Sequence, residues 1–280
     1  MYATNTRKEY KSEELFEEVA DLVVSVRTPD SSGSGVLFGS GDIIATNKHV
    51  IGNQKKVVIG TKRQQHTLGK VLRSYPDIDL AFVQIELSKA TEATTRQIRQ
   101  KKKSRVHSKP IRVGEHVFAI GHPLGLEYTF TQGIVSAVRR LIDEQEYLQI
   151  DASINPGNSG GGLFNKYGEL IGINTMGYAN TQGLNFAIPT GIVQQKYDEM
   201  LTELRSGALN YCAVCGFTSK DIKYCENCGS LLDSEQSIDE LDAIISACNN
   251  NSLKEILRCN SCGAEACDTD KYCTSCGSEI

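Results

Sequence analysis

The stretch Asp151-Ala-Ser-Ile-Asn-Pro-Gly-Asn-Ser159-Gly-Gly161 places one hydroxyl group in a tight turn with glycines on both sides. Glycine has no Cβ atom, so such a turn can adopt backbone conformations that direct several amide groups toward one point. A reactive serine needs this arrangement, because the carbonyl oxygen that it attacks becomes negatively charged. We therefore predict Ser159 as a nucleophile, with an oxyanion hole formed by the backbone of Gly157, Asn158 and Ser159.

A serine nucleophile also requires a base and a group that orients the base. The apolar run at residues 43–45 leads directly to His49, so a buried strand would deliver this histidine to its end. Asp79 begins another apolar run and is the predicted orienting carboxylate. Asp77 is the alternative carboxylate, because it would face the same side at the two-residue period of a strand. Among the other histidines, His122 lies in a glycine-containing turn and is the competing base.

Short apolar runs separated by glycines and polar residues make up most of the first 190 residues. Many short strands with turn signals between them are typical of an all-β sandwich or barrel. After Pro189 the apolar spacing changes to that of a helix over residues 190–205, with Gly207 as its stop signal. The predicted strands lie at residues 22–26, 36–38, 43–45, 57–59, 80–85, 117–120, 129–138, 148–150, 170–174 and 184–188.

Residues 16–205 resemble the protease domain of the HtrA/DegP branch of the trypsin-fold serine proteases. The resemblance implies a mainly β fold, a trypsin-like double β-barrel, with His49, Asp79 and Ser159 as a catalytic triad in the cleft between the barrels. It also implies a serine endopeptidase that acts on protein or peptide substrates through an acyl-enzyme. The matching segments occur in the family's order at residues 33–38, 46–51, 79–81, 121–126, 133–138, 151–163, 168–175 and 185–189.

The residue six positions before the nucleophile forms the base of the primary specificity pocket in such folds. Here it is Ser153, so no carboxylate is available to select Arg or Lys before the scissile bond. We therefore predict a modest apolar pocket that prefers small or medium aliphatic residues. The expected pocket residues are Ser153, Ile154, Asn174, Thr175, Met176 and Gly177.

All ten cysteines follow residue 211, and eight of them form four Cys-x-x-Cys pairs. Two such pairs can surround one metal ion with four thiolates, and both segments resemble short zinc ribbons. We predict two structural Zn²⁺ ions and no cofactor for catalysis. Redox-active thiols, and iron–sulfur chemistry or another metal, are the alternatives, and knuckles could pair within or across ribbons. The predicted ligands are Cys212, Cys215, Cys225, Cys228, Cys259, Cys262, Cys273 and Cys276, whereas Cys248 and Cys267 would be free thiols.

The change in composition predicts a protease domain at residues 1–207, a zinc ribbon at 208–232, a helical linker at 233–258 and a second ribbon at 259–280. Residues 210–280 contain twelve acidic and five basic residues, against a net charge of −4 for the whole chain. An acidic tail disfavours binding to nucleic acid, so we expect the ribbons to recruit a protein partner or substrate.

Two other functions remain open from the sequence: a catalytically silent peptide-binding module, and nucleic-acid binding through the ribbons. The basic stretch at residues 96–109 is interpreted as a solvated connecting loop, with a docking patch for an anionic partner as the alternative.

Three features predict a cytoplasmic protein that does not bind membranes. No apolar run approaches the roughly 18 residues of a spanning helix. Residues 1–18 lack the apolar core of a signal peptide. Paired cysteines are typical metal ligands in a reducing compartment. The family's usual PDZ domains and secretion signal are not expected here, so neither PDZ-gated activation nor trimer formation is carried over.

Overall fold

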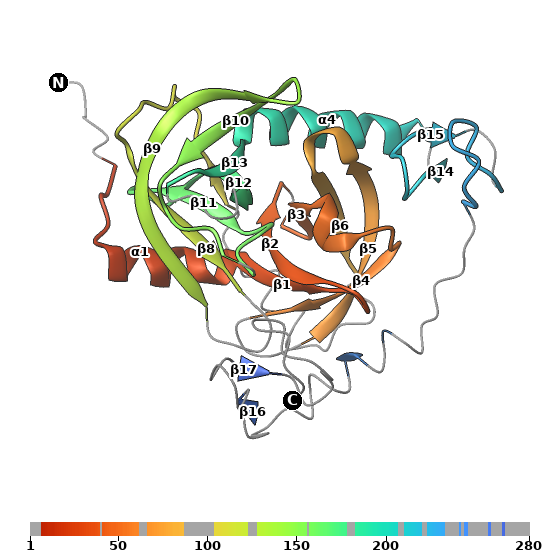
Figure 1. The fold of residues 1–280 in the computed structure, drawn as a ribbon, viewed down its shortest axis with the longest axis horizontal. Helices are drawn as coiled ribbons and strands as arrows, with labels where there is room; N and C mark the ends of the chain where they lie inside the picture. Colours follow the sequence, from red (N-terminus) through yellow and green to blue (C-terminus); the bar gives the residue numbers. More distant parts are fainter. Residues whose placement is uncertain are drawn as a thin grey trace.

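The computed structural model describes most of the first 232 residues and a few residues after them. The described residues are 7–39, 41–61, 66–86, 104–122, 128–155, 157–177, 183–206, 210–219, 223–232, 241, 244–245, 257–258 and 265–266. Two β-barrels dominate this part of the chain (Figure 1), as the sequence predicts. No helix among these residues is long and apolar enough to cross a membrane.

The first barrel contains six antiparallel strands in the order β1-β2-β3-β6-β5-β4, and pairing of β1 with β4 closes it. Val24, Leu37 and Ile44 fill its interior. Val23 on β1 packs on the other side of the sheet, against the second barrel. Strands buried on both faces read as continuous apolar runs. The strands are β1 (Val23–Arg27), β2 (Ser32–Phe38), β3 (Ile43–Asn47), β4 (Lys56–Gly60), β5 (His66–Tyr75) and β6 (Leu80–Ile85).

The second barrel follows the order β11-β8-β9-β10-β13-β12 and is closed by pairing of β11 with β12. The short strand β7 adds to β12 in parallel. The core of this barrel contains Val117, Leu148 and Ile171. The strands are β7 (Arg105–Val106), β8 (His116–Gly121), β9 (Thr129–Ile142), β10 (Gln145–Ile150), β11 (Gly162–Asn165), β12 (Glu169–Gly177) and β13 (Asn185–Pro189).

Helices cover the seam between the barrels. α4 (Thr190–Arg205) runs along both barrels (Figure 1), and its Tyr197 ring lies 5.3 Å from the Phe38 ring and 5.7 Å from the Phe82 ring. Each buried aromatic side chain of this kind contributes about 1.5–3 kcal/mol. α1 (Ser12–Val19) and the 3-10 helix η1 (Ala20–Leu22) precede β1. Phe164 and Ile188 of the second barrel belong to the same buried cluster as Phe38, so large side chains from both barrels meet at the seam.

Several short elements complete the described structure. α2 (Lys48–Ile51) follows β3, and the 3-10 helix η2 (Pro76–Ile78) joins β5 to β6. β14 (Asn210–Tyr211) pairs with β15 (Thr218–Ser219) beyond the C-terminal end of α4 (Figure 1). β16 (Leu257–Arg258) pairs with β17 (Glu265–Ala266).

Candidate active site

His49 and Asp79 meet at the rim of the first barrel. His49 lies in the single turn of α2, and its Nδ1 atom is 2.7 Å from Asp79 Oδ2. The backbone amide of His49 donates to Asp79 Oδ1 at 2.9 Å. A proton on Nδ1 is thus directed to the carboxylate, which leaves Nε2 available to a serine hydroxyl. The histidine side chain is 51% exposed, so a substrate can reach it.

Hydrogen bonds to the backbone of Asp79 also hold this residue in place. Its φ of 55° is in the left-handed region, which aspartate tolerates better than most residues. Its carbonyl oxygen accepts from the Lys48 amide at 3.1 Å and from the Asn47 side-chain amide at 3.0 Å. Burial lowers the pKa of the neighbouring Lys48, and the charge of Asp79 acts in the opposite direction. Asp77, the alternative carboxylate, is exposed on η2.

Ser159 lies in a turn before β11 of the second barrel. Gly157 and Gly160 on either side have φ values of 101° and 81°, which a residue with a Cβ rarely adopts. The Ser159 hydroxyl donates to the Thr175 carbonyl at 3.1 Å, and the Thr175 hydroxyl donates to Asp79 Oδ2 at 2.6 Å. No hydrogen bond among the described residues joins His49 to Ser159. Thr175 therefore connects the serine to the carboxylate.

The predicted oxyanion hole has two amides available. The Asn158 amide donates to the Asn155 carbonyl at 3.0 Å. Within the part of the chain that the structure describes, the amides of Gly157 and Ser159 have no acceptor. These two groups can therefore donate to a negatively charged oxygen, whereas the Asn158 amide is occupied in this conformation.

Ser34 on β2 supports this turn and was not singled out by the sequence pattern. Its hydroxyl donates to the Gly157 carbonyl and accepts from the His122 amide, and its own amide donates to the Ser159 carbonyl at 2.8 Å. A serine between two glycines, ahead of the predicted strand at residues 36–38, carries little signal of such a role. Its place in the family-like segment at residues 33–38 is the one available hint.

The predicted pocket residues divide into two groups. Ser153 and Gly177 are exposed, and Ile154 is partly buried against the second barrel's core, so these three remain candidates for the pocket. Asn174 is fully buried and donates to the Gly162 carbonyl at 3.2 Å. Thr175 is buried between Asp79 and Ser159, so neither side chain faces an open pocket. The side chain of Met176 lies outside the described residues.

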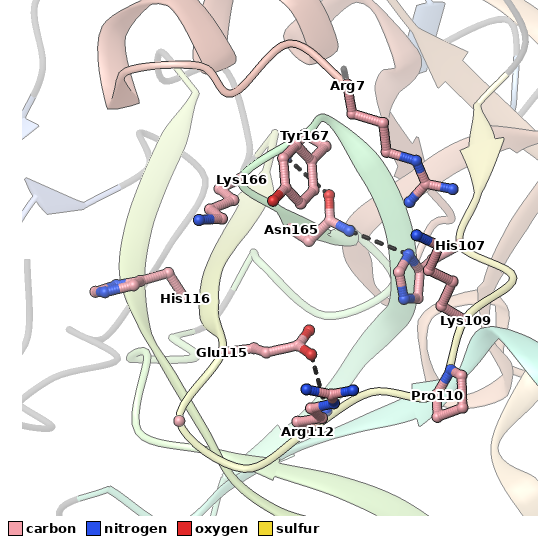
Figure 2. A pocket seen from close by; sticks show the side chains of 11 residues that line it. Arg7, His107, Lys109, Pro110, Arg112, Glu115, His116, Asn165, Lys166 and Tyr167 are labelled. Atoms are coloured by element: carbon pink, nitrogen blue, oxygen red, sulfur yellow. Dashed lines mark hydrogen bonds between the residues drawn. The ribbon is translucent and has the colours of Figure 1, made fainter. Parts of the chain in front are cut away.

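A cavity of about 760 Å³ lies elsewhere, at the end of β11 opposite the nucleophile. Figure 2 shows Asn165 and His107 pointing toward one another beside Arg7. His107 Nδ1 is 2.7 Å from Glu169 Oε2, which Arg7 also contacts at 3.0 Å. No residue predicted for the active site lines this cavity. Its buried polar network therefore belongs to the frame of the second barrel and not to the triad.

Four predicted metal ligands come together in the segment after α4. The sulfur atoms of Cys212, Cys215, Cys225 and Cys228 lie within 4.8 Å of one another. The Cys212–Cys228 and Cys215–Cys225 sulfur pairs are 3.6 Å apart. Metal–sulfur bonds of ~2.3 Å in a tetrahedron would separate sulfurs by ~3.8 Å. This cluster therefore has the geometry of a metal site, formed by two knuckles of the same ribbon.

Protonation of the cluster also bears on metal binding. Burial raises the pKa of Cys212 to about 11, and a hydrogen bond with Ser230 lowers the pKa of Cys228 to about 6. A metal ion that binds all four sulfurs would displace the protons that remain. The second predicted set of ligands (Cys259, Cys262, Cys273 and Cys276) lies outside the described residues, as do Cys248 and Cys267.

Comparison with known proteins agrees with this fold. The family model of the trypsin-like peptidase domain matches residues 33–173, which is half of the chain. The chain therefore belongs to the trypsin-like peptidase family. Within that family it is homologous to serine endoproteases of the HtrA/DegP type.

Two relatives illustrate the similarity. The chain is 33% identical over 180 residues to a Pseudomonas fulva protein named "Probable periplasmic serine endoprotease DegP-like", covering 62% of this chain and 36% of the relative. A Hahella chejuensis protein of the same name is 36% identical over 168 residues, covering 58% and 34% respectively. The chain thus spans about a third of the length of these curated relatives.

Solved structures show the same fold. The serine endoprotease from Yersinia pestis has a TM-score of 0.60 and 32% identity, covering 70% of this chain and 68% of that one. The HtrA-type protease AlgW, solved with a tripeptide, has a TM-score of 0.60 and 30% identity, covering 71% and 65%.

The comparisons contradict one prediction. The Pseudomonas and Hahella relatives are named periplasmic, so the expectation of a cytoplasmic protein is wrong. That expectation rested on the composition of residues 1–18 and on paired cysteines as a sign of a reducing compartment. Neither property determines where a folded protease domain operates. Paired cysteines in particular do not require a reducing compartment, because a bound metal ion also protects thiolates from oxidation.

Proposed function

We propose that this chain is a serine endopeptidase in which His49, Asp79 and Ser159 form the catalytic triad. The observation that carries the proposal is the 2.7 Å contact of His49 Nδ1 with Asp79 Oδ2, linked through Thr175 to the Ser159 hydroxyl. Family membership supports it independently, because residues 33–173 match the trypsin-like peptidase domain. The substrate is a protein or peptide, as the HtrA-type relatives suggest, and those relatives point to the periplasm.

The reaction follows from these positions. The Ser159 hydroxyl turns from the Thr175 carbonyl toward the substrate carbonyl, and His49 Nε2 accepts its proton as the new C–O bond forms. The amides of Gly157 and Ser159 stabilise the oxyanion. His49 then returns the proton to the leaving amine, the C–N bond breaks, and water hydrolyses the acyl-enzyme by the same route. Asp79 stabilises the imidazolium throughout. Ser153 and Ile154 favour small or medium aliphatic residues before the cleaved bond.

A fluorophosphonate probe tests the nucleophile, because it labels activated serines. We expect labelling of the wild-type protein and none of Ser159→Ala, with Ser206→Ala as a matched serine control exposed at the end of α4. For peptide hydrolysis, His49→Ala should lower kcat by roughly 10⁴-fold or more, whereas exposed His116→Ala should not. Full labelling of Ser159→Ala would refute the assignment of the nucleophile.

We further propose that the cysteines bind two structural Zn²⁺ ions and that the ribbons recruit a protein partner or substrate. Four sulfur ligands in tetrahedral positions suit zinc, and a closed four-sulfur site has no open position for catalysis. The proposed units are those given above, at residues 1–207, 208–232, 233–258 and 259–280. Elemental analysis should give two zinc ions per chain, and one for Cys225→Ser.

A further inference from the structure

The first ribbon packs directly on the protease barrel. The Tyr211 hydroxyl donates to the Val71 carbonyl on β5 at 3.2 Å, and its ring packs against the core of the first barrel. Arg73, also on β5, donates to the Gly216 carbonyl and contacts the Glu203 carboxylate of α4 at 2.9 Å. The Arg73 side chain is 11% exposed. One buried guanidinium group therefore joins the barrel, α4 and the first cysteine knuckle, defined here as residues 212–216.

Gly216 makes this contact possible. A Cβ atom there would lie 2.6 Å from Pro76 Cδ and 2.9 Å from the Ser74 carbonyl oxygen, closer than real Cβ atoms come. Its counterpart after the second cysteine pair, Gly229, has nearly the same φ, 72° against 73°, but would meet nothing within 4 Å. The two knuckles thus have the same backbone geometry, and only the first contacts the barrel at its glycine.

The contacted segment leads to the proposed active site. Ser74 is the second-last residue of β5, Pro76 begins η2, and the chain reaches Asp79 three residues later. Pro76 accepts the Asp79 amide at 3.4 Å. The chain between Pro76 and Asp79 is one short helical turn, so a shift of Pro76 is transmitted to the carboxylate that orients His49.

We propose that the first cysteine knuckle is a positioning element for Asp79. The metal ion holds residues 212–216 in shape, and the knuckle in turn holds residues 74–79 through Arg73 and Gly216. Metal occupancy then sets the turnover of the protease, although the ion takes no part in the chemistry. This inference rests on the proposed function and differs from the simpler expectation of a tail that acts separately from catalysis.

The pair Gly216→Ala and Gly229→Ala isolates the contact with the barrel. Both variants strain a knuckle glycine at the same φ, but only Gly216→Ala introduces a methyl group against Pro76. For a short unstructured peptide we expect Gly216→Ala to lower kcat roughly ten- to a hundredfold with little change in KM, because small misplacements of catalytic groups have effects of that size. Gly229→Ala should lower kcat several-fold less, and both should retain equal zinc.

Hydrogen exchange gives a readout that does not depend on activity. Backbone amides of residues 71–79 should exchange faster in Gly216→Ala than in Gly229→Ala, and faster in wild-type protein after zinc removal, with recovery when zinc is restored. Unchanged exchange in this segment under both treatments would overturn the proposal, as would equal losses of kcat in the two variants. A wild-type protein that does not hydrolyse peptides but shows the exchange differences would instead refute the proposed protease function and support the contact.

Discussion

Thr175 bonds to both Asp79 and Ser159, through its side chain and its backbone respectively. Its hydroxyl donates to the Asp79 carboxylate at 2.6 Å, while its carbonyl accepts the Ser159 hydroxyl at 3.1 Å. A charged acceptor strengthens the first bond relative to one between neutral groups. Because Thr175 is on β12 of the second barrel and Asp79 precedes β6 of the first, this residue also connects the barrels at the point where chemistry takes place.

Thr175→Val removes the hydroxyl but keeps the β-branched shape that the strand accommodates. A hydrogen bond to a charged group contributes about 1.5–3 kcal/mol, so we expect kcat for peptide hydrolysis to fall roughly ten- to a hundredfold. Thr202→Val is the matched control, because its hydroxyl bonds only to the Asp198 carbonyl on the exposed side of α4. Activity of Thr175→Val equal to that of the control would show that Asp79 needs no second donor.

The sequence predicts His49, Asp79 and Ser159 as the triad, but it assigns Thr175 to the specificity pocket and not to a contact with Asp79. The prediction of His49 and Asp79 rests on their places next to apolar runs, and that of Ser159 on its glycine-lined turn. Thr175 directly follows the apolar run at residues 170–174, and its residue type is common in strands. Thr175 bonds to Asp79 and Ser159, which are far from each other in the sequence. Local sequence patterns do not show that the fold brings these residues together.

On the scale of elements, β1 and β2 provide an internal comparison of two buried serines. Ser25 and Ser34 lie directly opposite each other in this strand pair. Both are buried, but the Ser34 hydroxyl bonds to the Gly157 carbonyl and the His122 amide, whereas the Ser25 hydroxyl has no hydrogen-bond partner among the described residues. Replacing each serine by alanine should therefore affect stability and activity differently on the two strands.

We expect Ser34→Ala to destabilise the protein by about 1–3 kcal/mol, because it leaves buried polar groups unpaired, and to lower kcat by distorting the turn at Gly157. Ser25→Ala should leave both properties nearly unchanged. Urea unfolding and peptide hydrolysis of the two variants provide the measurement. Equal effects would mean that Ser34 does not support the oxyanion hole.

The elements were predictable where burial was continuous. The runs on β6, β8 and β13 match observed strands closely, but β5 was missed because its apolar residues alternate with polar ones such as Lys70 and Arg73. The end of β9 was also missed. Asp143 and Glu144 turn the chain into β10 with φ values of 48° and 66°. Two-residue turns with positive φ usually contain Asn-Gly, and this turn has no such signal in the sequence.

At the scale of the whole molecule, one carboxylate connects segments far apart in the sequence. Glu169 contacts Arg7 at 3.0 Å, His107 at 2.7 Å and the Asn165 amide at 3.0 Å. Burial acts to raise the pKa of Glu169, but the hydrogen bonds with His107 and Asn165 and the charge of Arg7 outweigh it, and the net pKa is lowered. The charged carboxylate therefore stabilises the folded chain at neutral pH.

A lowered pKa in the folded state predicts stability that is present above the unfolded pKa of Glu169 and lost as the pH falls through the folded value. We expect Glu169→Gln to lower the free energy of unfolding by about 1–3 kcal/mol at pH 7. The difference should shrink as the pH falls below the unfolded pKa of about 4.3 and through the lowered folded value. Glu146→Gln, in an exposed pair with Arg139, is the control and should have little effect. A difference independent of pH would show that packing, not charge, accounts for the loss.

The overall fold could be predicted from the sequence, but the relation of the cysteine segment at residues 210–232 to the barrel could not. Arg73 and Gly216 are 143 residues apart. Neither has a type or spacing that indicates a contact, because an arginine on a half-polar strand is normally solvated and a glycine after Cys-x-x-Cys is explained by the knuckle alone.

Each barrel is built from one uninterrupted part of the chain, β1–β6 and then β8–β13, whereas the proposed triad takes two residues from the first and one from the second. This arrangement affects the order of events during folding. Segments of this size tend to fold as separate units, so each barrel can form before the other is complete. In refolding experiments, circular dichroism should therefore recover before reactivity with a serine probe does. The delay measures how long the two barrels take to dock and bring Ser159 to His49.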